Sequence, residues 1–116
     1  MSVTLYHNPK CSKSRQTLGL IEERGVTPTI VKYLETPPTS MELKDILGKL
    51  NISPRELLRK KEDEYSDLKL DDSSLSDEDL IKAMVEHPVL IERPIVITEN
   101  QARIGRPPEQ VLEILE

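Results

Sequence analysis

The pattern of apolar and polar residues predicts a strand, a helix and a second strand at the start of the chain. Val3–His7 is a short run containing β-branched and aromatic residues, which is typical of a strand. Residues 12–24 carry apolar side chains at helical spacing, and Gly25 is the expected left-handed stop. A second strand is expected over Thr29–Leu34, separated from the helix by Pro28. This order predicts a parallel strand pair joined by a right-handed crossover.

A polar, mainly helical block follows, from about residue 39 to residue 87. Its helix starts are marked by pairs of residues with the spacing of a capping box, in which each side chain binds the other's backbone N–H. These pairs are Thr39 with Glu42, Ser53 with Glu56, and Ser76 with Asp79. We expect the short helix after Ser53 to carry Leu57, Leu58 and Arg59.

The C-terminal part predicts a hairpin and a last helix. Ile95–Thr98 and Ala102–Gly105 read as antiparallel strands joined by a turn at Glu99 and Asn100. A helix starting at Pro107-Pro108-Glu109 is expected to turn its apolar residues, Val111, Leu112, Ile114 and Leu115, inward. The whole order predicts one α/β domain over residues 1–116, with a four-stranded mixed sheet, flanking helices and a central helical insertion.

Composition limits the classes of function. The 116 residues include 16 basic and 21 acidic side chains, for a net charge of -5, which argues against nucleic-acid binding as the main activity. No apolar run approaches the roughly 20 residues of a membrane span, and the first residues lack the pattern of a signal peptide. We therefore expect a cytoplasmic protein without a membrane partner. The single cysteine excludes an internal disulfide and a multi-thiolate metal site within one chain.

That cysteine, Cys11, stands between the first strand and the first helix. A free cysteine is often a buried apolar residue, but the neighbours of Cys11 are polar or charged. The partial positive charge of a helix N-terminus lowers a thiol pKa, and the cations Lys10, Lys13 and Arg15 would act in the same direction. The sequence therefore predicts a reactive thiolate. Because no second cysteine exists, any redox cycle needs a thiol from outside.

Other candidate residues lie farther along the chain. His7, four residues before Cys11, is either a structural histidine or a group that tunes the thiolate. His87 precedes a proline at a helix end, where a capping role is expected. Arginines suit tetrahedral oxyanions because the guanidinium forms paired hydrogen bonds. Arg59, Arg93 and Arg106 are the candidates, and their positions in the sequence leave open whether they converge.

Several separated motifs resemble the glutaredoxin-coupled arsenate reductase family, a branch of the thioredoxin-like fold. The motifs are Tyr6-His7-Asn8-Pro9-x-Cys11-x-x-Ser14-Arg15, Tyr33-Leu34-Glu35-x-Pro37-Pro38, Leu57-Leu58-Arg59-Lys60, His87-Pro88, Arg93-Pro94-Ile95-Val96 and Arg106-Pro107. They span nearly the whole chain in the family's order. With its lysine-rich loop and its end at Glu116, the chain resembles a short, housekeeping-type member.

The resemblance implies a mechanism and a set of site residues. Cys11 would attack arsenate, with the oxygens of arsenate held by Arg59, Arg93 and Arg106, while His7 tunes the thiol. Glutathione would attack the resulting adduct as co-substrate, glutaredoxin would resolve the mixed disulfide, and no cofactor or metal would be bound. The resemblance also implies supporting roles for Asn8, Ser14 and Arg15, and a cis peptide bond at Pro94 opposite the cysteine loop.

Two other functions remain open at this point. The Spx regulators share this fold and bind RNA polymerase, but they usually carry a Cys-x-x-Cys switch, whose second position here is Ser14. A glutathione-linked thiol oxidoreductase with a substrate other than arsenate is the third reading. The arginines favour an enzyme that acts on an oxyanion.

Overall fold

The computed structural model describes residues 2–115, which form two compact units. One unit combines the residues up to Thr36 with those from Arg93 onward, and the other is Pro37–Glu92. No helix in the described part of the chain is long and apolar enough to cross a membrane.

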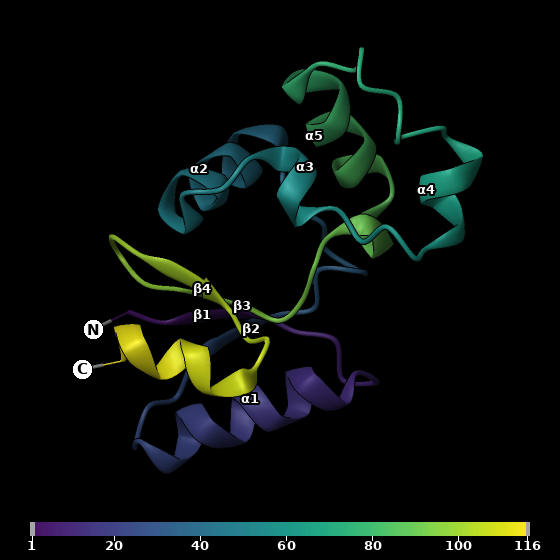
Figure 1. The fold of residues 1–116 in the computed structure, drawn as a ribbon. Coiled ribbons are helices and arrows are strands. Elements are labelled where there is room, and N and C mark those ends of the chain that lie inside the picture. The colour runs from purple at the N-terminus through teal and green to yellow at the C-terminus, as the bar shows by residue number, and fades with distance from the viewer. Residues whose placement is uncertain (1, 116) are drawn as a thin grey trace. The chain divides into compact units, whose positions relative to one another are not determined.

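The first unit is built on a four-stranded sheet of order β2-β1-β3-β4 (Figure 1). Its strands are β1 (Thr4–Tyr6), β2 (Thr29–Val31), β3 (Ile95–Ile97) and β4 (Ala102–Ile104). β1 pairs in parallel with β2 and antiparallel with β3, and β3 pairs antiparallel with β4. The predicted mixed sheet, parallel pair and C-terminal hairpin are therefore confirmed.

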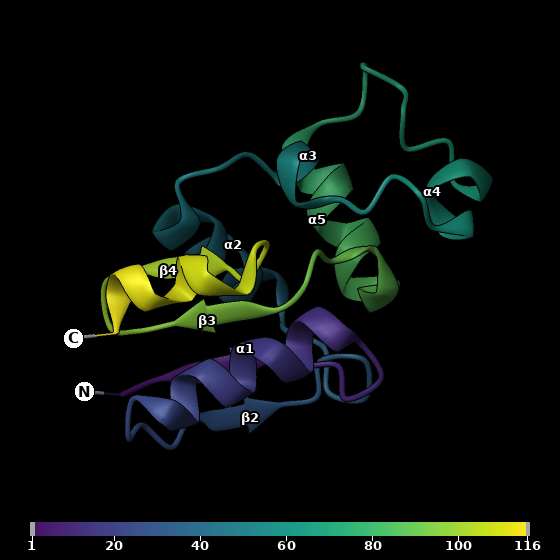
Figure 2. The same ribbon diagram turned by 60° about the horizontal axis from the view of Figure 1, so that its bottom comes forward.

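Two helical segments pack together on one face of this sheet. They are α1 (Ser12–Glu23), the crossover helix, and η2 (Pro108–Ile114), which lie side by side in Figures 1 and 2. Their buried residues Ile21, Val111 and Ile114 pack in a core that also includes strand residues such as Leu5 and Val96. The last helix has 3₁₀ rather than α geometry, although its inward-facing residues are those the sequence predicts.

The end of the first helix agrees with the sequence prediction, whereas the end of the second strand differs from it. Gly25 has φ +77°, so the expected left-handed residue after α1 is confirmed. β2 is shorter than expected because the chain turns at Lys32, whose carbonyl accepts hydrogen bonds from the N–H groups of Glu35 and Thr36. Leu34 therefore belongs to a turn rather than to the strand.

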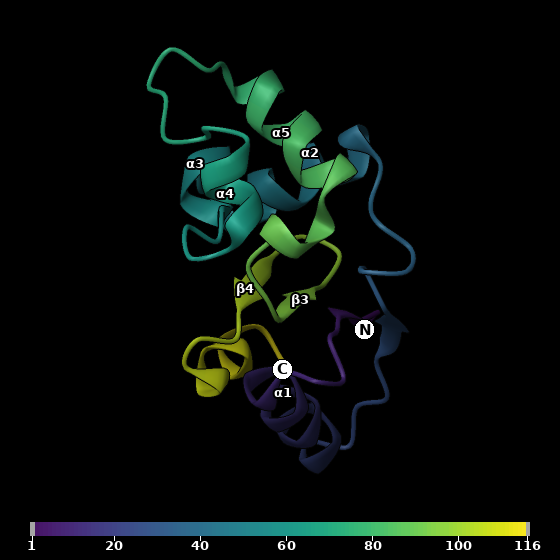
Figure 3. The same cartoon turned by 90° about the vertical axis from the view of Figure 1, so that its right-hand side faces the viewer.

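The second unit is helical (Figure 3). It contains α2 (Ser40–Leu50), α3 (Pro54–Leu57), α4 (Asp63–Asp67), α5 (Asp77–Glu86) and the 3₁₀ segment η1 (Pro88–Leu90). All three predicted capping boxes are present, with each N-cap hydroxyl accepting from the N3 backbone N–H and each N3 carboxylate accepting from the N-cap N–H. These local signals were sufficient to place the starts of three helices.

The expectation that Leu58 and Arg59 lie on a helix is wrong. α3 ends at Leu57, and Leu58 takes an extended conformation that forms a single antiparallel bridge with Ile91. The N–H of Arg59 donates to the carbonyl of Leu90 at 2.8 Å. Backbone pairing with the segment at Leu90 and Ile91 therefore replaces the helix expected at Leu58 and Arg59. The same pairing places the Arg59 side chain beside Glu92.

Gly105 lies where α1, Pro94 and the end of β4 meet. A Cβ atom on this residue would fall 2.5 Å from Oγ1 of Thr17 and 2.8 Å from Cγ of Pro94, both closer than carbon side chains tolerate. Thr17 and Pro94 are buried, and Thr17 Oγ1 already donates to the carbonyl of Lys13, so neither neighbour moves freely.

We expect Gly105→Ala to lower the free energy of unfolding by about 1–3 kcal/mol, the usual cost of overpacking a core. Denaturant titration would measure it. Gly48→Ala is the matched control, because Gly48 lies inside α2 with open space around it, and alanine there should be neutral or stabilising. Equal stability of the Gly105→Ala variant and the unsubstituted protein would contradict this account of the packing.

Candidate active site

Cys11 is presented by a tight loop between β1 and α1. The carbonyl of Asn8 accepts from the N–H of Cys11, and the Asn8 side-chain oxygen accepts from the N–H of Lys10, both at 3.0 Å. Cys11 is the N-cap residue of α1, with an extended backbone and a carbonyl that accepts from the N–H of Arg15. The half-buried thiol therefore sits at the helix start, as the sequence predicts.

The structure brings two of the three predicted arginines to this thiol. Nη2 of Arg106 lies 3.8 Å from the Cys11 sulfur and donates to it, and Nε of Arg106 donates to the carbonyl of Arg93 at 2.8 Å. The Arg93 side chain also interacts with the sulfur. Cys11, Arg93 and Arg106 thus form one cluster within the first unit.

Sheet register explains why these residues meet. In the β3–β4 hairpin Ile95 pairs with Ile104, so Arg93 and Arg106 leave the hairpin at the same end. Tyr6 at the end of β1 pairs with Ile95, which brings the loop after β1 to that edge as well. Both arginines precede prolines in cis peptide bonds, Arg93-Pro94 and Arg106-Pro107. The cis bond implied for Pro94 is therefore confirmed, and the second one was not anticipated.

The surroundings of Cys11 lower its pKa despite partial burial. Burial by itself raises the pKa, but the backbone N–H of Ser14, the Arg93 side chain and the N–H of Lys13 together outweigh it. The sulfur makes no capping hydrogen bond of ordinary geometry, so the two amides act as nearby dipoles. Arg93 is the cation that lowers this pKa, and Arg106 donates to the same sulfur, which agrees with the role that the resemblance implies for these two arginines.

We expect the Cys11 thiol to titrate below the roughly 8.5 of a free cysteine. Thiolate absorbance or alkylation rate against pH would measure its pKa, and Arg93→Ala should raise it. Because the folded pKa is the lower one, the thiolate adds stability that is complete above the unfolded pKa and is lost as pH falls through the folded pKa. An unshifted pKa in the folded protein would contradict the electrostatic account.

His7 bonds to Ser14, which in turn supports the cysteine loop. Nδ1 of His7 lies 2.7 Å from Oγ of Ser14, and the same oxygen accepts from the N–H of Asn8 at 3.0 Å. Burial, with the charges of Lys32 and Arg15, lowers the pKa of His7 and favours the neutral ring. His7 thus orients Ser14, whose backbone N–H faces the sulfur.

The remaining predicted residues make other contacts. Arg15 donates from Nη1 to the carbonyl of Pro9 at 2.9 Å, so it braces the loop. Arg59 belongs to the second unit, where its guanidinium forms ion pairs with Glu92 at 2.7 Å and Glu62 at 3.2 Å. Its oxyanion role stays a prediction. His87 is the C-cap residue of α5, the position where the sequence predicts a capping role.

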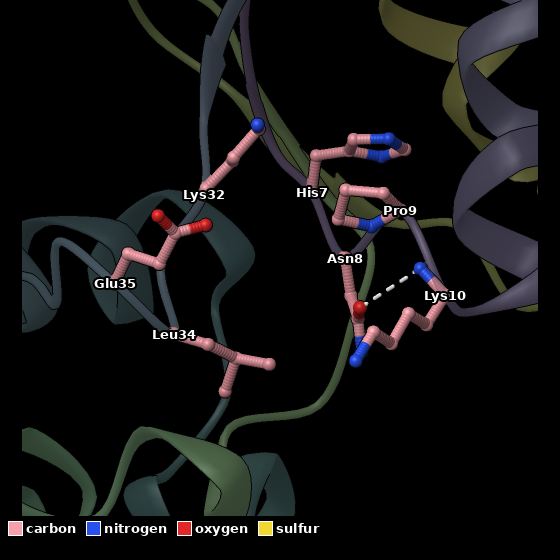
Figure 4. A pocket seen from close by; sticks show the side chains of 7 residues that line it. All are labelled: His7, Asn8, Pro9, Lys10, Lys32, Leu34 and Glu35. Carbon is pink, nitrogen blue, oxygen red and sulfur yellow. Dashed lines mark hydrogen bonds between the residues drawn. The ribbon is translucent and has the colours of Figure 1, made fainter.

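A pocket of about 280 Å³ opens beside the cysteine loop (Figure 4). It is lined by residues 7–10 together with Lys32, Leu34 and Glu35. β1 and β2 are parallel, so the chain segments that follow them reach the same edge of the sheet. Sequence reasoning missed Lys32 and Glu35 as site residues: the predicted strand extended to Leu34 and included Lys32, so only Glu35, directly after it, was an available signal. Among residues 2–115 no group of three or more His, Cys, Asp or Glu side chains is placed to hold a metal ion.

Comparison with known proteins agrees with this geometry. The sequence model of the ArsC family matches residues 6–114. The Escherichia coli K12 protein YfgD is 60% identical over 114 residues, covering 97% of this chain and 96% of its own. An arsenate reductase of Haemophilus influenzae is 53% identical over 116 residues, covering 99% of this chain and all of its own. The solved structure of arsenate reductase from Vibrio cholerae has a TM-score of 0.97 at 59% identity, covering 99% and 98% of the two chains.

The sheet order, the cysteine at the start of the crossover helix and the cis-proline at the start of β3 define a thioredoxin-like fold with a single-thiol site. Together with the match over nearly its whole length, they show that the chain belongs to the ArsC family.

Proposed function

We propose that this protein reduces arsenate to arsenite, with Cys11 as the nucleophile. The observation that carries the proposal is the cluster of Arg93 and Arg106 at the Cys11 sulfur, next to which an oxyanion would be both attracted and held. Relatives at about 50% identity are named arsenate reductases, which supports the same substrate.

The first step joins sulfur to arsenic. The Cys11 thiolate attacks As(V), one arsenate oxygen leaves as water after protonation, and a covalent Cys11–S–As(V) adduct forms. Arg93 and Arg106 bind the oxygens and offset negative charge during attack, because guanidinium forms strong paired hydrogen bonds with such anions. Arg59 is proposed as a third ligand. His7 acts through Ser14 to keep the loop amides oriented toward the sulfur.

The two electrons for arsenic come from thiols outside the chain, since Cys11 is the only cysteine. Glutathione, as co-substrate, attacks the Cys11 sulfur of the adduct, and the S–As bond breaks with its electron pair going to arsenic, which leaves Cys11 in a mixed disulfide with glutathione. A glutaredoxin thiol then attacks the glutathione sulfur of this disulfide, forms a glutaredoxin–glutathione disulfide and releases the Cys11 thiolate. Arsenite leaves and the Cys11 thiolate is regenerated. The balance is arsenate plus two thiols giving arsenite, one disulfide and water, without a bound cofactor. The reducing cytoplasm, where we place the protein, keeps such thiols available.

A coupled assay tests this function. Arsenate, glutathione, glutaredoxin, NADPH and glutathione reductase are mixed with the protein, and NADPH consumption is followed by absorbance. We expect consumption that requires arsenate, glutathione and glutaredoxin together. Arsenate-independent consumption would instead favour a thiol oxidoreductase with another substrate, and no consumption with any oxyanion would favour a Spx-like binding role.

A further inference from the structure

The pocket beside the cysteine loop carries charges of both signs. Figure 4 shows its two walls, with His7, Asn8, Pro9 and Lys10 on one side and Lys32, Leu34 and Glu35 on the other. The charged groups of Lys10, Lys32 and Glu35 form no ion pair or hydrogen bond within residues 2–115, and these three residues are exposed. Its volume of about 280 Å³ is near the lower end of ligand pockets, which suits a small molecule.

The pocket is also within reach of the reactive sulfur. Pro9 and Lys10 in its wall precede Cys11 directly, and consecutive Cα atoms are about 3.8 Å apart, so the Cα atoms of Pro9 and Cys11 are at most about 7.6 Å apart. The hydrogen bond from the N–H of Cys11 to the carbonyl of Asn8 holds the two ends of this turn together. A tripeptide bound there could extend its central thiol toward Cys11 or toward arsenic carried on it.

We propose that this pocket binds glutathione, an inference that rests on the proposed function. Glutathione has two carboxylates and one ammonium group, which match the ammonium groups of Lys10 and Lys32 and the carboxylate of Glu35. Leu34 and Pro9 provide apolar surface for the peptide between them. The arginine cluster at the sulfur is not among the residues that line this pocket, and we assign the oxyanion to that cluster.

The carboxylate of Glu35 argues against an inorganic oxyanion as the occupant. Arsenate carries only negative charge and gains nothing from Glu35, whereas a zwitterionic peptide gains from all three charged side chains. Charge complementarity of this kind selects the ligand and speeds its association. The pocket therefore separates the binding of the co-substrate from the binding of arsenate.

A reaction that needs no arsenate tests the pocket. Reduced protein is mixed with oxidised glutathione, the Cys11 thiolate attacks one sulfur, and a Cys11–glutathione disulfide forms with release of one glutathione thiolate. The rate, followed by mass spectrometry, is compared with that for hydroxyethyl disulfide, which lacks charges. We expect Lys10→Glu combined with Lys32→Glu to slow the glutathione reaction at least about tenfold, equivalent to about 1.4 kcal/mol, and the neutral reaction less than twofold.

Two positions remote from the loop provide the matched control for net charge: Arg24 is exposed, and Arg103 is half-buried and paired with Glu113. Arg24→Glu, at the C-terminal end of α1, combined with Arg103→Glu should change the rate with oxidised glutathione far less than the lysine pair does. The proposal that the pocket binds glutathione would be overturned by either of two results. One is equal slowing of the glutathione reaction by the lysine substitutions and by the arginine substitutions; the other is equal slowing of the charged and the neutral disulfide reactions by the lysine substitutions. If the lysine substitutions slow only the reaction with oxidised glutathione, but the protein does not reduce arsenate, the glutathione pocket would be supported and only the proposed function would be overturned.

Discussion

Replacing Cys11 by serine is expected to abolish arsenate reduction while leaving the fold intact. A serine hydroxyl is not ionised near neutral pH, so the nucleophile of the first step disappears. Loss of a nucleophile commonly costs a thousandfold or more in turnover, and we expect at least about that loss here. Because Cys11 is half-buried at a helix N-cap and serine is a favoured N-cap residue, the free energy of unfolding should change little.

The neighbouring Ser12 gives a matched control. Ser12 is exposed at the first position of α1, so Ser12→Ala should keep most of the activity. Circular dichroism and thermal unfolding would establish that both variants are folded before their turnover is compared in the coupled assay. Turnover in the Cys11→Ser variant above the rate without protein would exclude Cys11 as the nucleophile.

The parts of the structure that the sequence predicted are those set by neighbouring residues. A capping box acts over three residues, so Thr39 with Glu42 marks a helix start whatever the rest of the chain does. The position of Cys11 at a helix N-terminus follows from the same kind of local signal, and so does the left-handed stop at Gly25.

Long-range pairing decided what could not be predicted. Arg93 and Arg106 meet because the hairpin register aligns Ile95 with Ile104. This register cannot be deduced from the number of residues between the two arginines. The bridge between Leu58 and Ile91 likewise removed Arg59 from the helix expected for it. Only the resemblance to a family suggested the arginine cluster beforehand, and it did not indicate the second cis-proline or the pocket at Lys32 and Glu35.

Replacing Arg106 by alanine is expected to be the most damaging change outside the cysteine loop. It removes the donor 3.8 Å from the Cys11 sulfur and the 2.8 Å hydrogen bond that holds the carbonyl of Arg93. A hydrogen bond to a charged group contributes about 1.5–3 kcal/mol, which corresponds to a loss of about 10- to 150-fold in kcat/KM for arsenate. Arg106→Lys should recover little, because an ammonium cannot bind the sulfur, the carbonyl and an oxyanion through one planar fork.

Arg103 provides the control for this experiment. It lies in β4 three residues from Arg106, but its Nε donates to Glu113 at 2.8 Å instead of joining the Cys11 cluster. Arg103→Ala removes the same charge and should leave kcat/KM for arsenate within about twofold, as is usual for exposed ion pairs. Since both variants change the net charge equally, a difference between them reports the position of the guanidinium. Equal losses of kcat/KM in the two variants would mean that Arg106 acts only through the net charge of the protein. The oxyanion site would then have to lie elsewhere.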